Sequence, residues 1–195
     1  QVQHPVRFVS GSAVGYYGNR GDEPLTESSA PGEGFLTDVV LAWEASAAPA
    51  VDAGASVALA RTGIVLARQG GAMERLLQLA RFGLAGPLGS GKQYWPWITL
   101  DDEVGALLHL LDRDDLTGPV NLSAPEPARQ RDIVAAIGRA LNRPAVLPAP
   151  SPALRIVLGE FPTEILGSQR IVGEVLAPSG YDFRPPDPEG AARWP

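Results

Sequence analysis

The sequence contains no cysteine and only two histidines, His4 and His109. Without thiol groups the chain cannot form disulfide bonds, a thiolate metal site or a cysteine nucleophile. Two histidines also leave few imidazole ligands for a zinc site. We therefore expect a protein that works without a bound metal ion.

Positively charged residues are few and scattered, since 16 Lys and Arg stand against 22 Asp and Glu and give a formal net charge of −6. A nucleic-acid groove needs a continuous positive face, so we expect no nucleic-acid partner. No apolar run approaches the roughly 20 residues that span a bilayer, and the first residues lack the pattern of a signal peptide. We therefore expect no membrane association and a cytoplasmic location.

The composition that remains is typical of a globular protein, with 45% hydrophobic and 19% charged residues. A length of 195 residues allows one sizeable core, or one core and a small appendage. Glycine and proline are spread between periodic segments, which indicates many short loops.

Strand and helix patterns alternate over residues 1–117. Buried strands are expected over residues 6–10 and 57–66, and each is followed by a segment with helical periodicity. Such alternation is typical of α/β proteins, so we predict a partial Rossmann-like parallel sheet with helices. The first helix should bury Phe35, Leu36, Val39, Val40 and Trp43, and the second Met73, Leu76, Leu77 and Ala80.

After about residue 118 the predicted elements become shorter. A strand is expected over residues 120–122, followed by a helix with Ile133, Ile137 and Leu141 on one face. Further helices should begin near Ser151 and Asp187. We therefore predict a second unit over residues 118–195, a small C-terminal α+β lobe on the substrate side.

The segment from Gly86 to Asp102 allows two interpretations. Gly86, Gly91 and Lys92 fit the pattern G-x-x-x-x-G-K of a phosphate-binding loop. However, Gln93 replaces the Ser or Thr that would bind Mg²⁺, no good strand precedes the loop, and the aromatic residues after it cannot open a helix. A nucleotide triphosphatase is therefore the weakest functional hypothesis.

The second interpretation is a loop, a short strand over residues 97–100 and a helix capped by Asp101 or Asp102. Trp95 and Trp97 would combine flat apolar surface with nearby donors, which suits a ring-bearing polar ligand. The alternative is that both tryptophans are core residues. The predicted substrate wall comprises Lys92, Gln93, Trp95 and Trp97, and the helix should present on one apolar face Val104, Leu107, Leu108 and Leu111.

Several motifs together resemble one protein family. They lie at residues 10–18 (S-G-S-A-V-G-Y-Y-G), 61–66 (R-T-G-I-V-L), 86–93 (G-P-L-G-S-G-K-Q) and 97–102 (W-I-T-L-D-D). The chain resembles an atypical branch of the extended short-chain dehydrogenase/reductases, usually labelled a sugar-nucleotide epimerase family. The likeness extends over nearly all 195 residues, including Gly118 to Asn121 and Leu158 to Glu160.

This resemblance implies a Rossmann-like domain that binds NADP(H), with a smaller lobe over the substrate cleft. It also implies that the chain is the C-terminal part of a longer protein, whose N-terminal part with the glycine fingerprint is missing here. The expected ligand is a small molecule, a nucleotide-sugar or similar substrate. The oligomeric state stays open, with a homodimer as one alternative. The resemblance places the cofactor against Ser10, Gly11, Ser12 and Val65.

The chain departs from the superfamily at the catalytic pair. Extended reductases and epimerases use Tyr-x-x-x-Lys, in which the lysine lowers the tyrosine pKa for proton exchange. The corresponding positions here are Phe35 and Val39, and the branch's usual W-I-H ends in Thr99. Ser12 and Tyr16 are the substitutes we consider, because both follow the strand end where ligands of α/β sheets collect.

Other interpretations stay open. Tyr16 and Tyr17 would otherwise simply pack a turn, and a nearby cation for a catalytic tyrosine would be Arg20, Arg61 or Lys92. The acidic loop with Asp22, Glu23 and Glu27 and the isolated His109 are expected to be solvated or structural. The competing functions are an epimerase or oxidoreductase and, because the Tyr/Lys pair is lost, a non-catalytic NADP(H)-binding regulatory or interaction protein.

Overall fold

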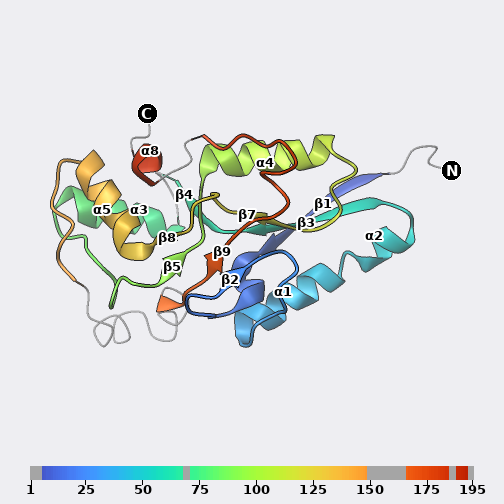
Figure 1. Cartoon of the computed structure of the whole chain (residues 1–195), viewed down its shortest axis with the longest axis horizontal. Helices are drawn as coiled ribbons and strands as arrows, with labels where there is room; N and C mark the ends of the chain where they lie inside the picture. The colour runs from blue at the N-terminus through green and yellow to red at the C-terminus, as the bar shows by residue number, and fades with distance from the viewer. Residues whose placement is uncertain (1–5, 68–70, 149–165, 185–187, 193–195) are drawn as a thin grey trace.

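A computed structural model describes residues 6–67, 71–148, 166–184 and 188–192. Helices and strands alternate along the first two thirds of the chain, as the sequence predicts (Figure 1). In chain order the elements are β1 (Arg7–Ala13), the 3-10 helix η1 (Val14–Tyr17), β2 (Pro24–Leu25), α1 (Phe35–Ala45), α2 (Ala48–Asp52), β3 (Ser56–Thr62), β4 (Ile64–Leu66), α3 (Gly71–Arg81), β5 (Tyr94–Trp95), β6 (Trp97–Thr99), α4 (Leu100–Asp112), β7 (Gly118–Leu122), β8 (Ala128–Arg129), α5 (Gln130–Ala140), β9 (Arg170–Ile171) and α8 (Pro188–Ala192).

The central sheet has the strand order β1-β3-β7, and both pairings are parallel. This confirms the predicted α/β class with a parallel sheet. The strand at 120–122 was expected in the second lobe, but it lies within β7 and extends this sheet. Val120 and Leu122 of β7 are fully buried in the same cluster as Ala58 and Ala60 of β3. Burial beside β3 therefore outweighs the change of pattern at residue 118.

Helix α4 covers one face of the sheet and α1 packs on the other. Small side chains allow α4 to approach closely, because Ala106 of the helix meets Ala58 and Ala60 of β3 in one buried cluster with Leu110. On the opposite face α1 buries Thr37 and Val40. Ala47, just after the end of α1, is also buried. Within the described residues β1 pairs only with β3, so one long edge of β1 is open.

The apolar face predicted for α1 is wrong. Val40 is buried, but Phe35 and Trp43 are 77% and 54% exposed and Leu36 is also exposed. The helix has two stripes, and the one that meets the sheet contains Thr37 and the half-buried Glu44. Periodicity locates apolar residues but does not show which stripe has a partner.

Helix α4 shows the same inversion. The helix exists where predicted, yet Val104, Leu108 and Leu111 are exposed, while Ala106 and Leu110 face the sheet. Its cap also differs from the prediction, because the Thr99 hydroxyl oxygen accepts a 3.0 Å hydrogen bond from the backbone N–H of Asp102. The Asp102 carboxylate accepts the Thr99 hydroxyl proton at 2.9 Å, so the cap is reciprocal.

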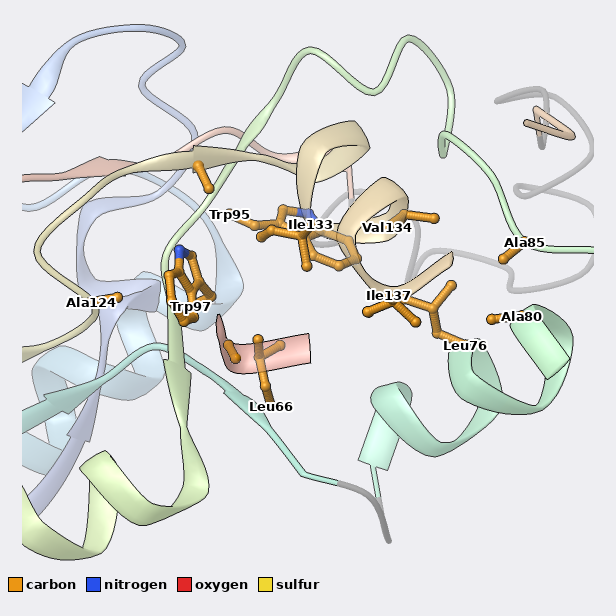
Figure 2. Close-up of a cluster of buried hydrophobic side chains, with 12 residues drawn as sticks. Leu66, Leu76, Ala80, Ala85, Trp95, Trp97, Ala124, Ile133, Val134 and Ile137 are labelled. Atoms are coloured by element: carbon orange, nitrogen blue, oxygen red, sulfur yellow. The ribbon is translucent and has the colours of Figure 1, made fainter. Parts of the chain in front are cut away.

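A second hydrophobic cluster holds the remaining elements together (Figure 2). It joins Leu76 and Ala80 of α3 to Ile133, Val134 and Ile137 of α5, and it encloses the indoles of Trp95 and Trp97. The inner residues predicted for these two helices are thus confirmed at Leu76, Ala80, Ile133 and Ile137. The side chain of Met73 and the helix start expected at Ser151 lie outside the described residues.

Three further short pairings are present in the described residues. Strands β4 and β6 pair in parallel, β5 and β8 pair antiparallel, and β2 pairs with the distant β9. Gly63 is needed where β3 passes into β4, because a Cβ there would lie 2.3 Å from the carbonyl oxygen of Pro96. In the part of the chain that the structure describes, no helix combines the length and apolar character needed to cross a membrane.

Candidate functional site at the carboxyl ends of the parallel strands

Polar side chains form a row at the carboxyl ends of the three central strands. Ser12 of β1 is in register with Arg61 of β3, which is in register with Asn121 of β7. All three residues are buried, on the face of the sheet that α1 covers. Ligands of open parallel α/β sheets bind beyond this end of the strands, so the row is the candidate site.

Arg61 and Glu44 of α1 form a buried ion pair at the centre of this row. Nε and Nη2 of Arg61 donate to the two carboxylate oxygens at 2.8 and 2.9 Å. Burial raises the pKa of Glu44, but hydrogen bonds from Arg61 and Ser12 more than offset this and leave the pKa lowered. Burial likewise opposes the charge on Arg61, whose pKa is nevertheless raised by its bonds to Glu44 and Tyr17. Both groups therefore stay ionised.

Ser12 is tied to this ion pair. Its hydroxyl donates a 2.6 Å hydrogen bond to Oε1 of Glu44. The proton of Ser12 is thus directed at the carboxylate, and the oxygen lone pairs are what the hydroxyl can offer to a ligand. A donor role for Ser12 would require the bond to Glu44 to open.

Tyr16 and Tyr17 differ sharply in environment. Tyr17 is fully buried, and its hydroxyl donates to Oδ1 of Asn121 at 2.7 Å and accepts from Arg61 at 3.0 Å. Burial raises the pKa of Tyr17, so this phenol is a fixed neutral member of the network. Tyr16 is only partly buried, and the Arg61 guanidinium carbon lies 3.5 Å from its ring centroid. Of the three cations considered from the sequence, Arg61 is therefore the one beside Tyr16.

Glu27 was interpreted as a solvated residue, and the structure corrects this. Its buried carboxylate accepts hydrogen bonds from the backbone N–H groups of Asn121 at 3.1 Å and Glu174 at 2.9 Å. Arg61 also reaches the Glu27 carbonyl oxygen at 3.4 Å. The side chain thus fastens the segment after β2 to the end of β7. A single acidic residue in a polar loop does not indicate this role from the sequence alone.

The residues expected at the cofactor differ in accessibility. Ser10 is partly buried and Gly11 is exposed, and nothing lies within 4 Å of the position that a Cβ on Gly11 would take. Val65 lies in β4, pairs with Ile98 of β6 and is partly buried beside the core under α4. The structure therefore has Ser10, Gly11 and Ser12 consecutive on β1, while Val65 lies in the separate two-stranded sheet of β4 and β6.

The predicted substrate wall divides into buried and exposed parts. Trp95 and Trp97 are buried in the hydrophobic cluster (Figure 2). Trp97 donates its indole N–H to the carbonyl oxygen of Glu126 at 3.3 Å. Their burial matches the alternative in which both are core residues. Gln93 is also buried and donates to the Leu88 carbonyl at 3.0 Å, while Lys92 is exposed.

The glycine loop before these residues lacks the surroundings of a phosphate loop. It follows helix α3 and leads into the short strand β5 instead of a helix. The first backbone N–H groups of α5, those of Gln130 and Arg131, donate to the carbonyl oxygens of Gln93 and Gly91, so they are already taken up by the loop itself. The described residues also contain no group of three or more His, Cys, Asp or Glu side chains that could hold a metal ion. The triphosphatase hypothesis therefore has no structural support.

A buried acidic side chain lies on the opposite face of the central sheet, the face that α4 covers. Glu103, in the first turn of α4, accepts a 2.8 Å hydrogen bond from Thr62 at the end of β3. Its second carboxylate oxygen has no hydrogen-bond partner among the described residues, nor do Nδ2 of Asn121 and Oγ of Ser123. Burial raises the pKa of Glu103, because only one weak partner compensates for the lost water.

The positions of the usual catalytic pair offer no chemistry. Phe35 begins α1 with its ring largely exposed, and Val39 lies one turn further along the helix. Neither side chain has a proton to exchange. Thr99, in place of the histidine, is fully buried as the cap of α4.

Comparisons with known proteins agree with this architecture. Residues 149–194 match the model of a domain of unknown function, DUF1731. The epimerase family protein MT2273 of Mycobacterium tuberculosis is 44% identical over 177 residues, which are 90% of this chain and 59% of that protein. A chloroplastic homologue of epimerase family protein SDR39U1 from Arabidopsis thaliana is 36% identical over 92% of this chain and 52% of its own length.

Solved structures show the same relationship. Human epimerase family protein SDR39U1, solved with NADPH, has a TM-score of 0.90 and 32% identity over 99% of this chain and 66% of that one. A nucleoside-diphosphate sugar epimerase from Corynebacterium glutamicum has a TM-score of 0.76 and 33% identity over 98% of this chain and 37% of that one.

The parallel sheet with helices on both faces is that of a Rossmann-like α/β protein, and these similarities place the chain in the short-chain dehydrogenase/reductase superfamily. Within it, the chain belongs to the atypical epimerase-like branch. The chain spans about 59% of the length of its mycobacterial relative and 66% of the human protein.

Proposed function

We propose that this chain is the substrate-side part of an NADP(H)-binding protein of the epimerase and oxidoreductase type, which acts on a nucleotide-sugar or a similar polar substrate. The observation that supports this most is the row of Ser12, Arg61 and Asn121 at the carboxyl ends of parallel strands. Similarity to the human protein solved with NADPH supports the cofactor. Similarity to the sugar epimerase of Corynebacterium glutamicum supports the substrate class.

The residues present fit one end of a dinucleotide. The exposed Gly11, with no atom within 4 Å of the position of a Cβ, leaves the backbone of β1 open to a ligand next to Ser10 and Ser12 in the chain. These residues and Val65 would hold the nicotinamide, which supplies hydride transfer when it is bound. Ser12 would accept a hydrogen bond from the ligand, since Glu44 takes its proton.

The pyrophosphate end of a dinucleotide does not fit the described residues. It needs a strand, a glycine-rich turn and a helix N-terminus in sequence. Strand β1 leads into the short η1 instead, and the glycine loop that ends at Gly91 follows a helix. This part of the cofactor would therefore bind to residues outside this chain.

Three surfaces support the docking of such a unit beside β1. Phe8 is exposed on β1, whose outer edge is unpaired in the described residues. The exposed stripe of α1 with Trp43 and the exposed stripe of α4 with Leu108 lie on opposite faces of the same sheet. A further parallel strand with helices on both faces would cover all three surfaces, which explains why the sequence pattern predicts them as core.

Tyr16 is the group best placed for proton transfer in this scheme. It is accessible, whereas Tyr17 is sealed in the core. Arg61 holds a fixed positive charge against the Tyr16 ring, and Glu44 binds the Nε and Nη2 edge of the guanidinium. The ion pair is thus a positioning element for Tyr16 and Ser12, and Phe35 and Val39 contribute nothing to proton exchange.

The test is NADPH oxidation by the full-length protein with a panel of carbonyl and sugar-nucleotide substrates. Tyr16→Phe should lower kcat by about 100-fold or more, the range for removal of a general acid, while NADPH binding followed by fluorescence is retained. Ser12→Ala should also lower turnover. Ser28→Ala is the matched control, since among the described residues this exposed hydroxyl bonds to Thr26 alone. Full turnover in both site variants would remove the proposed roles.

A second function is favoured by one specific observation. With Phe35 and Val39 at the catalytic positions, the protein would bind NADP(H) without hydride transfer and act as a regulatory or interaction protein. This alternative predicts NADPH binding with no oxidation by any substrate of the panel. Oxidation of bound NADPH by a single substrate would reject it.

A further inference from the structure

Two arginine side chains stack on Tyr94 at the start of β5. The guanidinium carbon of Arg129 lies 4.4 Å from the centroid of the Tyr94 ring, and that of Arg170 lies 5.6 Å from it. Lys92 is exposed nearby, and its carbonyl oxygen accepts a hydrogen bond from Arg129. Two cationic side chains thus lie against one tyrosine in a chain whose formal net charge is −6.

Little negative charge balances this cluster. Arg129 pairs with Asp22 through a single 3.2 Å hydrogen bond, and the Asp22 side chain is 68% exposed. Among the described residues, no acidic side chain forms an ion pair with Arg170 or Lys92. By contrast, Arg139 binds both oxygens of Glu189. An exposed pair held by one bond exchanges readily with a competing anion.

The cluster is nevertheless held in place by buried backbone contacts. Ser168 accepts a hydrogen bond from the Tyr94 N–H at 3.0 Å and donates one to the Gly21 carbonyl at 2.6 Å. Gln169, next to Arg170, donates to the Val14 carbonyl at 3.0 Å. Val14 begins the 3-10 helix that contains Tyr16, so the cluster is joined directly to the candidate site.

We propose that Arg129 and Arg170, stacked on Tyr94, bind the phosphoryl groups of the substrate, and that Asp22 occupies Arg129 until the ligand replaces it. A tyrosine face holds a guanidinium by its plane and leaves the N–H edges free for oxyanions. The identity of the ligand as the substrate rests on the function proposed above. A phosphorylated substrate would then extend from Tyr16 at the strand ends to Tyr94.

The test is calorimetric titration of the purified protein with pyrophosphate at low salt. Arg129→Gln and Arg170→Gln should each weaken binding about tenfold, because each removes charge-assisted hydrogen bonds. Asp22→Asn should tighten binding several-fold, since the competing carboxylate is gone. Arg139→Gln is the matched control, because this exposed arginine also pairs with an acid but lies between α5 and α8.

The possible results of these titrations distinguish failure of the anion subsite from failure of the proposed function. Absence of saturable binding, or an equal loss in Arg139→Gln, overturns the subsite, and an unchanged affinity in Asp22→Asn overturns the exchange with Asp22. A parallel titration with a nucleoside diphosphate supports phosphoryl recognition if both probes lose affinity in the two arginine variants. Failure of NADPH binding by the full-length protein, with the pyrophosphate results intact, would reject the proposed function and leave the anion subsite standing.

Discussion

Replacing Arg61 with methionine should be among the most destabilising single changes in the chain. Arg61 is 3% exposed and Glu44 11% exposed, and four hydrogen bonds from Arg61 reach Glu44, Tyr17 and Glu27. Removing one member of a buried ion pair typically costs about 3–5 kcal/mol, because the remaining charge stays buried without a partner. We expect a loss in this range for Arg61→Met, measured by urea unfolding at pH 7.

The double variant Arg61→Met with Glu44→Leu tests whether the loss of stability comes from the Glu44 charge that stays buried without a partner. A hydrophobic replacement of both partners is often neutral or better, so the double variant should recover most of the lost free energy of unfolding. Circular dichroism would give the midpoint and slope for the wild type, both single variants and the double variant. A loss below about 1 kcal/mol for Arg61→Met, or no recovery in the double variant, would refute the view that the buried charge dominates.

Three further predictions concern stability. Burial raises the pKa of Glu103 above its ordinary value of 4.5, so the folded state holds this proton more tightly than the unfolded state does. The free energy of unfolding should therefore fall as the pH rises from 4.5 through the folded pKa. Glu103→Gln should flatten this pH dependence in urea unfolding between about pH 4 and 8, and an unchanged slope would contradict the assignment. Gly63→Ala should lower the free energy of unfolding by about 1–3 kcal/mol, because its Cβ would lie 2.3 Å from the Pro96 carbonyl oxygen. Gly54→Ala, where no atom lies within 4 Å of the new Cβ, tests the effect of backbone strain without a steric clash. Trp97→Ala should cost about 3–5 kcal/mol in thermal or urea unfolding if the indole is a core residue; a small loss with weaker ligand binding would favour the substrate-wall interpretation.

The sequence predicts the class and order of elements because periodicity depends on local spacing. Strands β1 and β3 and helices α1, α3, α4 and α5 lie where their patterns indicate. Register and partner choice depend on distant residues. Strand β7 therefore joined the sheet although its sequence neighbourhood indicated a separate lobe.

The inverted helix faces have a physical explanation. In α4 the closest contact with the sheet is made by a small residue, Ala106 against Ala58 and Ala60, beside the buried Leu110, while Leu108 and Leu111 are exposed. A hydrophobicity pattern gives most weight to the large side chains. It therefore selects the stripe of large residues, which is exposed in the structure, and misses the close contact made by Ala106.

The candidate site was predictable only in part. Ser12 and Tyr16 could be proposed because they follow a strand, and Arg61 could be named as a cation. Glu44 and Glu27 gave no such signal, since their roles depend on contacts made across 17 and 94 residues of sequence. Long-range ion pairs of this kind follow from the fold and not from local composition.

Affinity for NADPH tests the central claim most directly. We predict that the isolated chain binds NADPH only weakly, because under the proposed function it would contact the nicotinamide end alone. Joining it to the remaining part present in its relatives should give micromolar binding or tighter. The fluorescence of NADPH titrated with each protein would measure both affinities under the same conditions. Micromolar binding by the isolated chain would contradict the account.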